Sequence, residues 1–362
     1  MKNVRTKTGK IVAGGMITLA LTYITFLPGC KKNSETVIPT TYGPSMQVVY
    51  LTADDGSYNA AKTDTNLVNA WGIAISPNGK IWVSSEGKGV TTIYDGTGAT
   101  VLAPVTVTGA AKGAKGMPTG QVYNSTTDFV LTSNNNPAKF VFCGLDGAIT
   151  AWNTGAATVT VAMKDGASYT GLAIGNDGTG NFLYAADNKN GTIDVYDKNF
   201  TLTGGRFFSD PDLPAGFKPY NIQNIDGLLY VTYYAVGGGV YGSNTGNGFV
   251  NVFNPNGTLV NRFASRGPLN LPWGVAKAPA AMGLSANAIL IGNFGDGHII
   301  VYEADGTYDG QLQMNGTILA IDGLWAITTA PSTATSLDPD AVYFAAGPAG
   351  QKHGTFGYIK KM

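Results

Sequence analysis

Short apolar runs separated by polar turns recur along the chain after residue 30. In residues 182–186 the run is continuous, whereas in residues 192–196 apolar and polar side chains alternate. Asp-Gly and Asn-Gly pairs lie between such runs, and these pairs favour the tight type I′ turns of β-hairpins. No segment after residue 30 keeps a sustained 3.6-residue apolar period, so we expect short strands and almost no helix in the mature protein.

A recurring motif divides the chain into repeats. In each copy a polar residue or a proline precedes an aromatic or small residue and a short apolar run, most clearly at Trp71, Trp273 and Trp325. The copies begin near residues 71, 118, 171, 220, 273 and 325. A period of about fifty residues is the size of one four-stranded propeller blade. We therefore predict an all-β, six-bladed β-propeller, in which residues 201–208 form the outer strand of the third blade.

The last repeat contains only three apolar runs that predict strands, at residues 324–328, 341–346 and 355–359. Residues 47–52 precede the first repeat and have no partner there. Because an open ring would leave strand edges unpaired, we predict that this N-terminal strand pairs with residues 355–359 and closes the last blade. The propeller then covers residues 47–362. A pair of β-sandwiches is the alternative, but it would not produce so regular a repeat.

The first 29 residues have the pattern of an export signal. Basic residues precede an apolar segment over residues 11–27, and Leu27-Pro28-Gly29-Cys30 resembles the lipobox of bacterial lipoproteins, although Pro28 departs from the commonest pattern. A transmembrane anchor is the alternative. We expect removal of residues 1–29, acylation of Cys30 and a flexible tether over residues 30–46. The protein would be an exported, membrane-anchored lipoprotein of the bacterial cell envelope, in the periplasm or at the outer membrane.

The charge and the cysteine content argue against a nucleic-acid partner and against a disulfide. The chain holds 23 basic and 23 acidic residues, and four of the basic ones lie within the first 29 residues, which contain no acidic ones. The mature part is therefore mildly acidic, which argues against a nucleic-acid partner. Cys30 and Cys143 are the two cysteines. With Cys30 acylated, Cys143 has no disulfide partner and is interpreted as a small buried hydrophobe in a strand.

Several longer motifs lie within the repeats, at residues 210–217, 221–225, 271–276, 292–297, 321–325 and 353–357. On these motifs the chain, over about residues 47–359, resembles a family of uncharacterised bacterial secreted proteins, some with a PEP-CTERM tail. It also looks like NHL-type and TolB-like six-bladed propellers. The resemblance implies the fold and brings no activity with it.

A ligand site is expected where the blades present polar and aromatic side chains to the channel. In a propeller blade, the start of the first strand and the turn between the second and third strands lie on the same face. We predict that the site on this face is formed by Trp71, Tyr220, Asn221, Trp273, Asn293, Asp296, His298, Asp322, Trp325 and His353. Such a rim suits a small polar molecule, a sugar or a peptide. Alternatively, the tryptophans plug the hub and the Asp and Asn residues only form turns.

One long connection lies on the same predicted face. Residues 235–248 are rich in glycine and include Tyr241, Asn244 and Asn247. Long loops without regular structure are usually functional or disordered. We expect this connection to border or cover the channel mouth.

Two function classes fit these observations. The first is a non-catalytic binding or scaffold protein at the cell envelope, with an unknown ligand. The second is a lactonase- or lyase-like enzyme with a divalent metal of the Ca²⁺ type in the central channel. The chain has two histidines and no pair of free cysteines, which argues against a zinc hydrolase. It also contains neither a nucleophile elbow nor a P-loop. Convergent carboxylates and amides would favour the enzyme, and a mouth plugged by tryptophan would favour binding.

Overall fold

The computed structural model describes residues 40–205, 208–235 and 245–362. These residues belong to the unit Thr36–Met362, and the second unit, Met1–Glu35, lies outside the described residues. Regular structure is almost all β, as the sequence predicts. The helical segments in the described ranges are α1 (Pro348–Gln351) and the 3-10 turns η1 (Gly56–Tyr58), η2 (Glu86–Lys88) and η3 (Ala280–Met282).

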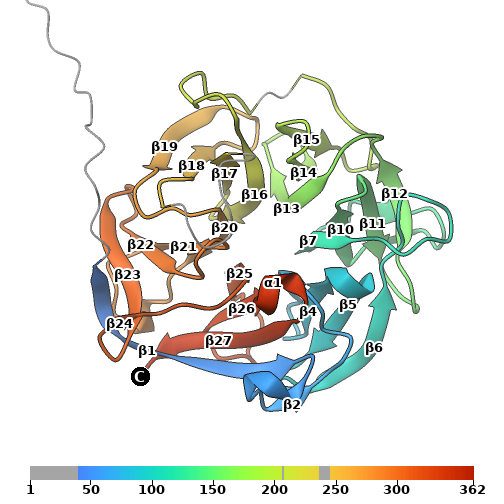
Figure 1. Cartoon of the computed structure of the whole chain (residues 1–362). Helices are drawn as coiled ribbons and strands as arrows, with labels where there is room; N and C mark the ends of the chain where they lie inside the picture. Colours follow the sequence, from blue (N-terminus) through green and yellow to red (C-terminus); the bar gives the residue numbers. More distant parts are fainter. Residues whose placement is uncertain (1–39, 206–207, 236–244) are drawn as a thin grey trace, which may run out of the picture. The chain divides into compact units, whose positions relative to one another are not determined.

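Four antiparallel sheets follow the order of the chain (Figure 1). The first contains β3 (Ala70–Ile75), β4 (Ile81–Ser85), β5 (Val90–Tyr94) and β6 (Thr100–Thr106). The second contains β7 (Pro118–Tyr123), β10 (Phe140–Gly144), β11 (Ala148–Trp152) and β12 (Val159–Met163), and the hairpin β8 (Val130–Leu131) and β9 (Asn136–Pro137) interrupts it. The third contains β13 (Tyr169–Asn176), β14 (Asn181–Asp187) and β15 (Thr192–Tyr196). The fourth contains β16 (Phe217–Ile225), β17 (Leu228–Ala235), β18 (Phe249–Phe253) and β19 (Leu259–Ser265).

The remaining strands form one ten-stranded sheet. Its first part is β20 (Pro272–Lys277), β21 (Ile289–Asn293), β22 (Ile299–Tyr302) and β23 (Tyr308–Met314). It continues through β1 (Thr41–Ala53), β27 (Thr355–Lys361), β26 (Val342–Ala346) and β25 (Leu324–Thr329). The short strands β24 (Thr317–Ile318) and β2 (Lys62–Thr63) pair with β23 and β1.

The inner strand of each group lies against the inner strand of the next. In order, β3 contacts β7, β7 contacts β13, β13 contacts β16, β16 contacts β20, β20 contacts β25, and β25 contacts β3 (Figure 1). Glycines allow this close approach. A Cβ atom on Gly72 would overlap the carbonyl oxygen of Thr119, and one on Gly120 would overlap the amide of Leu172. Gly72 and Gly120 therefore lie where neighbouring inner strands touch.

The N-terminal strand β1 pairs with the last strand, as predicted. Gln47 is opposite Lys360 and Thr52 is opposite Phe356 in an antiparallel ladder with β27. The strand begins earlier than residue 47, because Thr41 and the residues after it also pair, in parallel, with β23. Residues 41–46, which we assigned to the tether, are thus part of the strand, and Met46 is fully buried.

The predicted outer strand of the third group, over residues 201–208, is wrong for the part that the structure describes. Leu202 makes one isolated bridge to Tyr196, and both the amide and the hydroxyl of Thr203 donate to the carbonyl oxygen of Val195. The loop between β7 and β10, which carries the separate hairpin β8–β9, packs against this turn. The Phe129 ring in this loop packs on Phe200, and the amide of Phe129 donates to the carbonyl oxygen of Lys198.

Cys143 lies in the core, as predicted. It is 1% exposed and packs within β10 among buried apolar side chains such as Ile149 and Leu183. Burial raises the pKa of its thiol to about 12, so the thiol stays protonated at neutral pH.

Asp210, in the segment before β16, forms a partly buried ion pair with Arg262. Its carboxylate accepts hydrogen bonds from Arg262 on β19, at 2.9 Å from Nε, and from Asn251 on β18, at 3.0 Å. Burial by itself would raise the pKa of Asp210, but these hydrogen bonds and the Arg262 charge outweigh it and lower the pKa. Because the folded pKa lies below the unfolded one, the carboxylate stabilises the fold above its unfolded pKa of about 4, and this stability is lost as the pH falls through the folded pKa.

We expect Asp210→Asn to lower the free energy of unfolding by about 2 kcal/mol at pH 7, because it leaves the Arg262 charge without its partner. The difference from the unmodified protein should shrink as the pH is lowered toward 3. Urea unfolding at several pH values measures this. Asp212→Asn, at an exposed neighbouring carboxylate, is the control and should have little effect. A pH-independent difference for Asp210→Asn would contradict this role of the charge.

Candidate functional site

Stacked aromatic rings close the channel at the face where the inner strands begin, here called the start face. Trp325 stacks on Trp71 and on Phe294, with both centroid distances 3.8 Å and interplanar angles of 17° and 22°. The rings of Trp273 and Tyr220 pack against Trp325 in a T-shaped arrangement, with centroid distances of 6.0 and 5.8 Å. All five side chains are at most 8% exposed. We call these five residues the aromatic plug.

Hydrogen bonds hold the aromatic plug across the ring of strands. Trp325 Nε1 donates to Asn69 Oδ1 at 3.0 Å, and Trp273 Nε1 donates to the carbonyl oxygen of Thr170 at 3.0 Å. Asn221 Nδ2 donates to the carbonyl oxygen of Trp273 at 2.8 Å. Burial and the neighbouring Tyr234 raise the pKa of Tyr220 well above its usual value. The structure therefore brings Trp71, Tyr220, Asn221, Trp273 and Trp325 together as packed core.

The other predicted site residues on this face serve local turns and loops. Asn293 is fully buried, and its side chain bonds to the backbone of Pro268 and Asn270. Asp296 accepts from the backbone amide of His298 at 3.0 Å and from the Asn270 side chain at 3.0 Å.

Asp322 and His353 lie beside α1. Asp322 accepts a hydrogen bond from the backbone amide of Ala349 at 2.8 Å. His353 Nδ1 lies 2.9 Å from an Asp54 carboxylate oxygen and 3.2 Å from one of Asp55. Asp54, Asp55 and His353 could together bind a metal ion, because their ligand atoms lie within 4.8 Å of one another. In the part of the chain that the structure describes, this is the one group of three or more His, Cys, Asp or Glu side chains that come so close. This group joins the end of β1 to the loop before β27, and none of its three residues is among those that line the channel.

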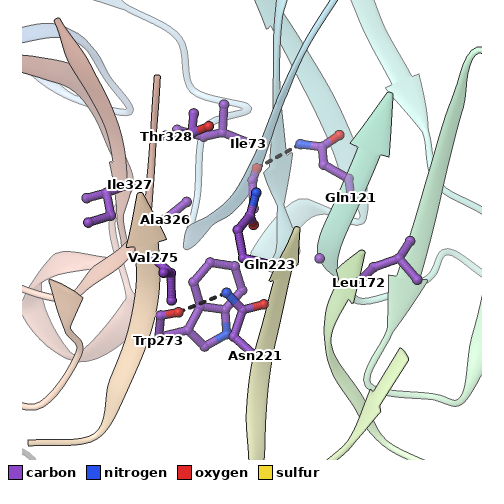
Figure 2. Close-up of a pocket in the computed structure, with 12 residues that line it drawn as sticks. Ile73, Gln121, Leu172, Asn221, Gln223, Trp273, Val275, Ala326, Ile327 and Thr328 are labelled. Atoms are coloured by element: carbon purple, nitrogen blue, oxygen red, sulfur yellow. Dashed lines mark hydrogen bonds between the residues drawn. The ribbon is translucent and has the colours of Figure 1, made fainter. Parts of the chain in front are cut away.

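A narrow cavity of about 10 Å³, room for about one water molecule, lies between the inner strands, next to the aromatic plug (Figure 2). Each of the six inner strands contributes to its wall. The lining residues are Gly72, Ile73, Gly120, Gln121, Leu172, Asn221, Gln223, Trp273, Val275, Ala326, Ile327 and Thr328. The exposed part of the wall is more polar than apolar, and the amide groups of Gln121, Asn221 and Gln223 supply most of its polar side-chain atoms.

The cavity widens toward the opposite face, where the inner strands end, here called the end face. A second space of about 220 Å³ shares Ile73, Gln121, Leu172, Gln223 and Thr328 with the cavity. It continues along the last residues of the inner strands to Ile75, Tyr123, Ile174, Asn224 and Pro331. The wider mouth of the channel is therefore at the end face, whereas the sequence analysis placed the site at the start face.

The lining chemistry limits what the channel can do. Within the described residues that line the cavity and its mouth, none is Asp, Glu, His, Lys, Arg or Cys. General acid–base or nucleophilic catalysis and metal binding depend mainly on such groups. The lining instead combines aliphatic side chains with amides and a threonine hydroxyl, which is typical of a binding site for an uncharged molecule.

Gln121 is the most distinctive polar group of the channel, and the sequence analysis missed it. The residue is 5% exposed, and its Nε2 donates to the carbonyl oxygens of Gly72 at 2.7 Å and Trp82 at 2.8 Å. Its Oε1 is buried and has no hydrogen-bond partner. Ile73 and Leu172 occupy the same place in neighbouring repeats. A glutamine at a position that is otherwise apolar was the signal that aligning the repeats could have found.

Two sequence predictions fall on segments outside the described residues. Tyr241 and Asn244 belong to residues 236–244, and Cys30 with the lipobox belongs to residues 1–39. Asn247 is described, and its Oδ1 accepts from the amide of Ala235 at 2.9 Å, which joins the two ends of the long connection. No helix in the described ranges is both long and apolar enough to cross a membrane.

Solved structures with a similar fold are β-propellers. A gluconolactonase from Xanthomonas campestris aligns with a TM-score of 0.54 and 13% identity, over 90% of this chain and 97% of that one. Virginiamycin B lyase from Staphylococcus aureus aligns with a TM-score of 0.52 and 11% identity, over 88% of this chain and 99% of that one. At such low identity the likeness establishes the propeller-like, nearly all-β fold and nothing about activity.

No protein-family model matches the chain. Two proteins of Acanthamoeba polyphaga mimivirus are clear relatives. Uncharacterized protein R648 is 34% identical over 73% of this chain and 69% of its own length, and uncharacterized protein L690 is 33% identical over 83% and 82%. These relatives are viral, so they do not support the bacterial family that the sequence analysis inferred. The chain belongs to the family of these two mimivirus proteins.

Proposed function

We propose that the domain is a six-bladed β-propeller, closed by β1, that binds a small uncharged polar molecule through the end face of its channel. The closed order of inner-strand contacts from β3 to β25 and back to β3 supports the number of blades. The ladder between β1 and β27 supports closure by the N-terminal strand.

The buried, unpartnered Oε1 of Gln121 carries the proposal. An unsatisfied buried carbonyl costs about 1–3 kcal/mol, and this one belongs to a residue that lines both the cavity and its mouth. A ligand hydroxyl or amide that donates to Oε1 would recover that free energy. Because the channel offers no charged group to balance a buried charge, an uncharged ligand is favoured.

A thermal-shift panel of neutral sugars, lactones and short uncharged peptides tests this proposal. A ligand present at about 100 times its Kd should stabilise the protein by about 2.7 kcal/mol. We expect Gln121→Met, which keeps the volume but removes the acceptor, to weaken binding about tenfold. Asn261→Leu, at an exposed position on β19, should bind like the unmodified protein. Equal affinity of Gln121→Met and the unmodified protein would refute the role of this amide.

A lactonase- or lyase-like enzyme is the second candidate, because solved propellers with this fold include a gluconolactonase and a lyase. Such an enzyme would need ionisable groups or a metal at its site. The described lining of the channel offers none of the usual acids, bases or metal ligands. Binding without catalysis is therefore the stronger proposal.

We also propose that the protein is exported and held at a membrane of the cell envelope by acylation of Cys30, with residues 1–29 removed. The support is the basic and apolar pattern before Leu27-Pro28-Gly29-Cys30. In a bacterial host that processes lipoproteins, Cys30→Ala should move the protein out of the membrane fraction or leave it unprocessed. Fractionation and the mass of the mature N-terminus measure this. A variant that is processed and anchored as before would overturn the lipobox assignment.

A further inference from the structure

A third space, of about 340 Å³ and open to solvent, lies between the first and second sheets. Its lining includes Trp82, Tyr123, Phe140 and Trp152, with Lys80 and Lys139 among the same lining residues. We call it the aromatic groove. It adjoins the channel mouth at the end face, because Tyr123 lines both spaces. The proposed channel site and this groove share no other lining residue.

The aromatic wall of the groove is rigid. Trp82 is 2% exposed and stacks on Phe140, with a centroid distance of 4.1 Å and an interplanar angle of 21°. Trp152 packs on Trp82 at 4.7 Å, and its Nε1 donates to the carbonyl oxygen of Gly155 at 2.9 Å, which fixes its orientation. Trp152 and Tyr123 are half-buried. Their rings are therefore held in place while part of each surface stays accessible.

The charge of the groove is unusual for this protein. Lys80 and Lys139 are exposed, and the Nζ atom of Lys139 lies 5.9 Å from the centre of the Trp152 ring. Neither ammonium group forms an ion pair with any residue that the structure describes. The part of the chain after residue 29 has more acidic than basic residues. Two unpaired lysines beside one aromatic wall therefore form a local positive site that is complementary to an anion.

We propose that the aromatic groove binds an acidic saccharide. A sugar ring lies with its apolar C–H face on Trp152 and Tyr123, as sugar rings commonly pack on aromatic side chains. The carboxylate of the sugar lies near Lys80 and Lys139. The exposed Asn78 at the rim offers an amide to the sugar hydroxyls. A space of this size accommodates more than a single ring.

Calorimetric titration of the whole protein with trigalacturonate, a neutral galactose trimer and benzoate tests this inference. We expect the acidic trimer to bind more tightly than the neutral trimer, with an affinity that falls as salt is added, and benzoate to bind more weakly than either. The double variant K80Q/K139Q should weaken binding of the acidic trimer about tenfold and remove most of its salt dependence. Lys198→Gln, at an exposed turn of the third sheet, is the matched control. It should change neither the affinity for the acidic trimer nor the salt dependence of that affinity.

Further variants separate this groove from the channel. Trp152→Ala should weaken binding of the acidic trimer, while K80Q/K139Q should leave the thermal shift given by an uncharged channel ligand unchanged, so that failure of the channel proposal would not be mistaken for failure of this one. Circular dichroism checks that each variant is folded. The inference is overturned if acidic and neutral trimers bind equally well, if benzoate binds as tightly as the acidic trimer, if K80Q/K139Q behaves like Lys198→Gln, or if no saccharide binds.

Discussion

Trp325→Ala should lower the free energy of unfolding by about 4 kcal/mol, because it removes the central ring of the aromatic plug. Trp325 is 1% exposed and stacks on both Trp71 and Phe294. Its loss leaves a cavity between these two rings and breaks the bond to Asn69. Chemical denaturation, followed by circular dichroism, measures the change.

The half-buried Trp152 provides the comparison for this variant. Trp152→Ala should cost clearly less, since part of that ring is already in contact with water. If Trp325 instead served mainly to contact a ligand, Trp325→Ala would abolish binding at little cost in stability. A loss of stability no larger than that of Trp152→Ala would thus contradict the plug and favour the site predicted at the start face.

Gly72→Ala should destabilise the protein by about 3 kcal/mol, although it adds a single methyl group. The added Cβ would overlap the carbonyl oxygen of Thr119 and lie 3.2 Å from the amide nitrogen of Gln121. These atoms belong to the backbone of the neighbouring inner strand, which cannot move without disturbing its own ladder with β10. Thermal and urea unfolding quantify the effect.

Gly56→Ala is the matched control, because a Cβ there meets no atom within 4 Å. It should change the free energy of unfolding by only a few tenths of a kcal/mol. A tolerated Gly72→Ala would mean that the inner strands are more widely spaced than the structure describes, and that the channel is correspondingly wider.

The strands could be predicted from the sequence because each is a local feature. The tryptophans at Trp71, Trp273 and Trp325 indicate where β3, β20 and β25 begin, and the Asp-Gly pairs indicate where hairpins turn. Both patterns depend only on neighbouring residues. The pairing of β1 with β27 could be predicted because an open ring would leave strand edges unpaired. The absence of a strand over residues 201–205 could not be predicted from local patterns. The loop that carries the hairpin β8–β9 lies more than sixty residues earlier in the chain, and it packs on this turn through Phe129 and Phe200.

The candidate site depended on features that local patterns do not contain. The sequence placed Trp71, Trp273 and Trp325 at equivalent positions but could not decide whether these rings line an open mouth or pack on one another. That choice depends on distances between side chains from different blades. Asp296 accepts a hydrogen bond from the backbone amide of His298 in a turn, which was the alternative stated for the Asp and Asn residues. Gln121, by contrast, could be recognised from aligned repeats, because a polar side chain replaces an apolar one there.

Hydrogen–deuterium exchange with and without a bound ligand tests the central claim, that the channel is closed at the start face and binds its ligand through the end face. The ligand is the neutral compound that raises the melting temperature most in the thermal-shift panel. We predict protection at the ends of the inner strands, around residues 121–123, 223–224 and 328–331, with no change around Trp71, Asn293 and His353. Protection confined to Trp71, Asn293 and His353 would contradict the claim and place the site at the start face.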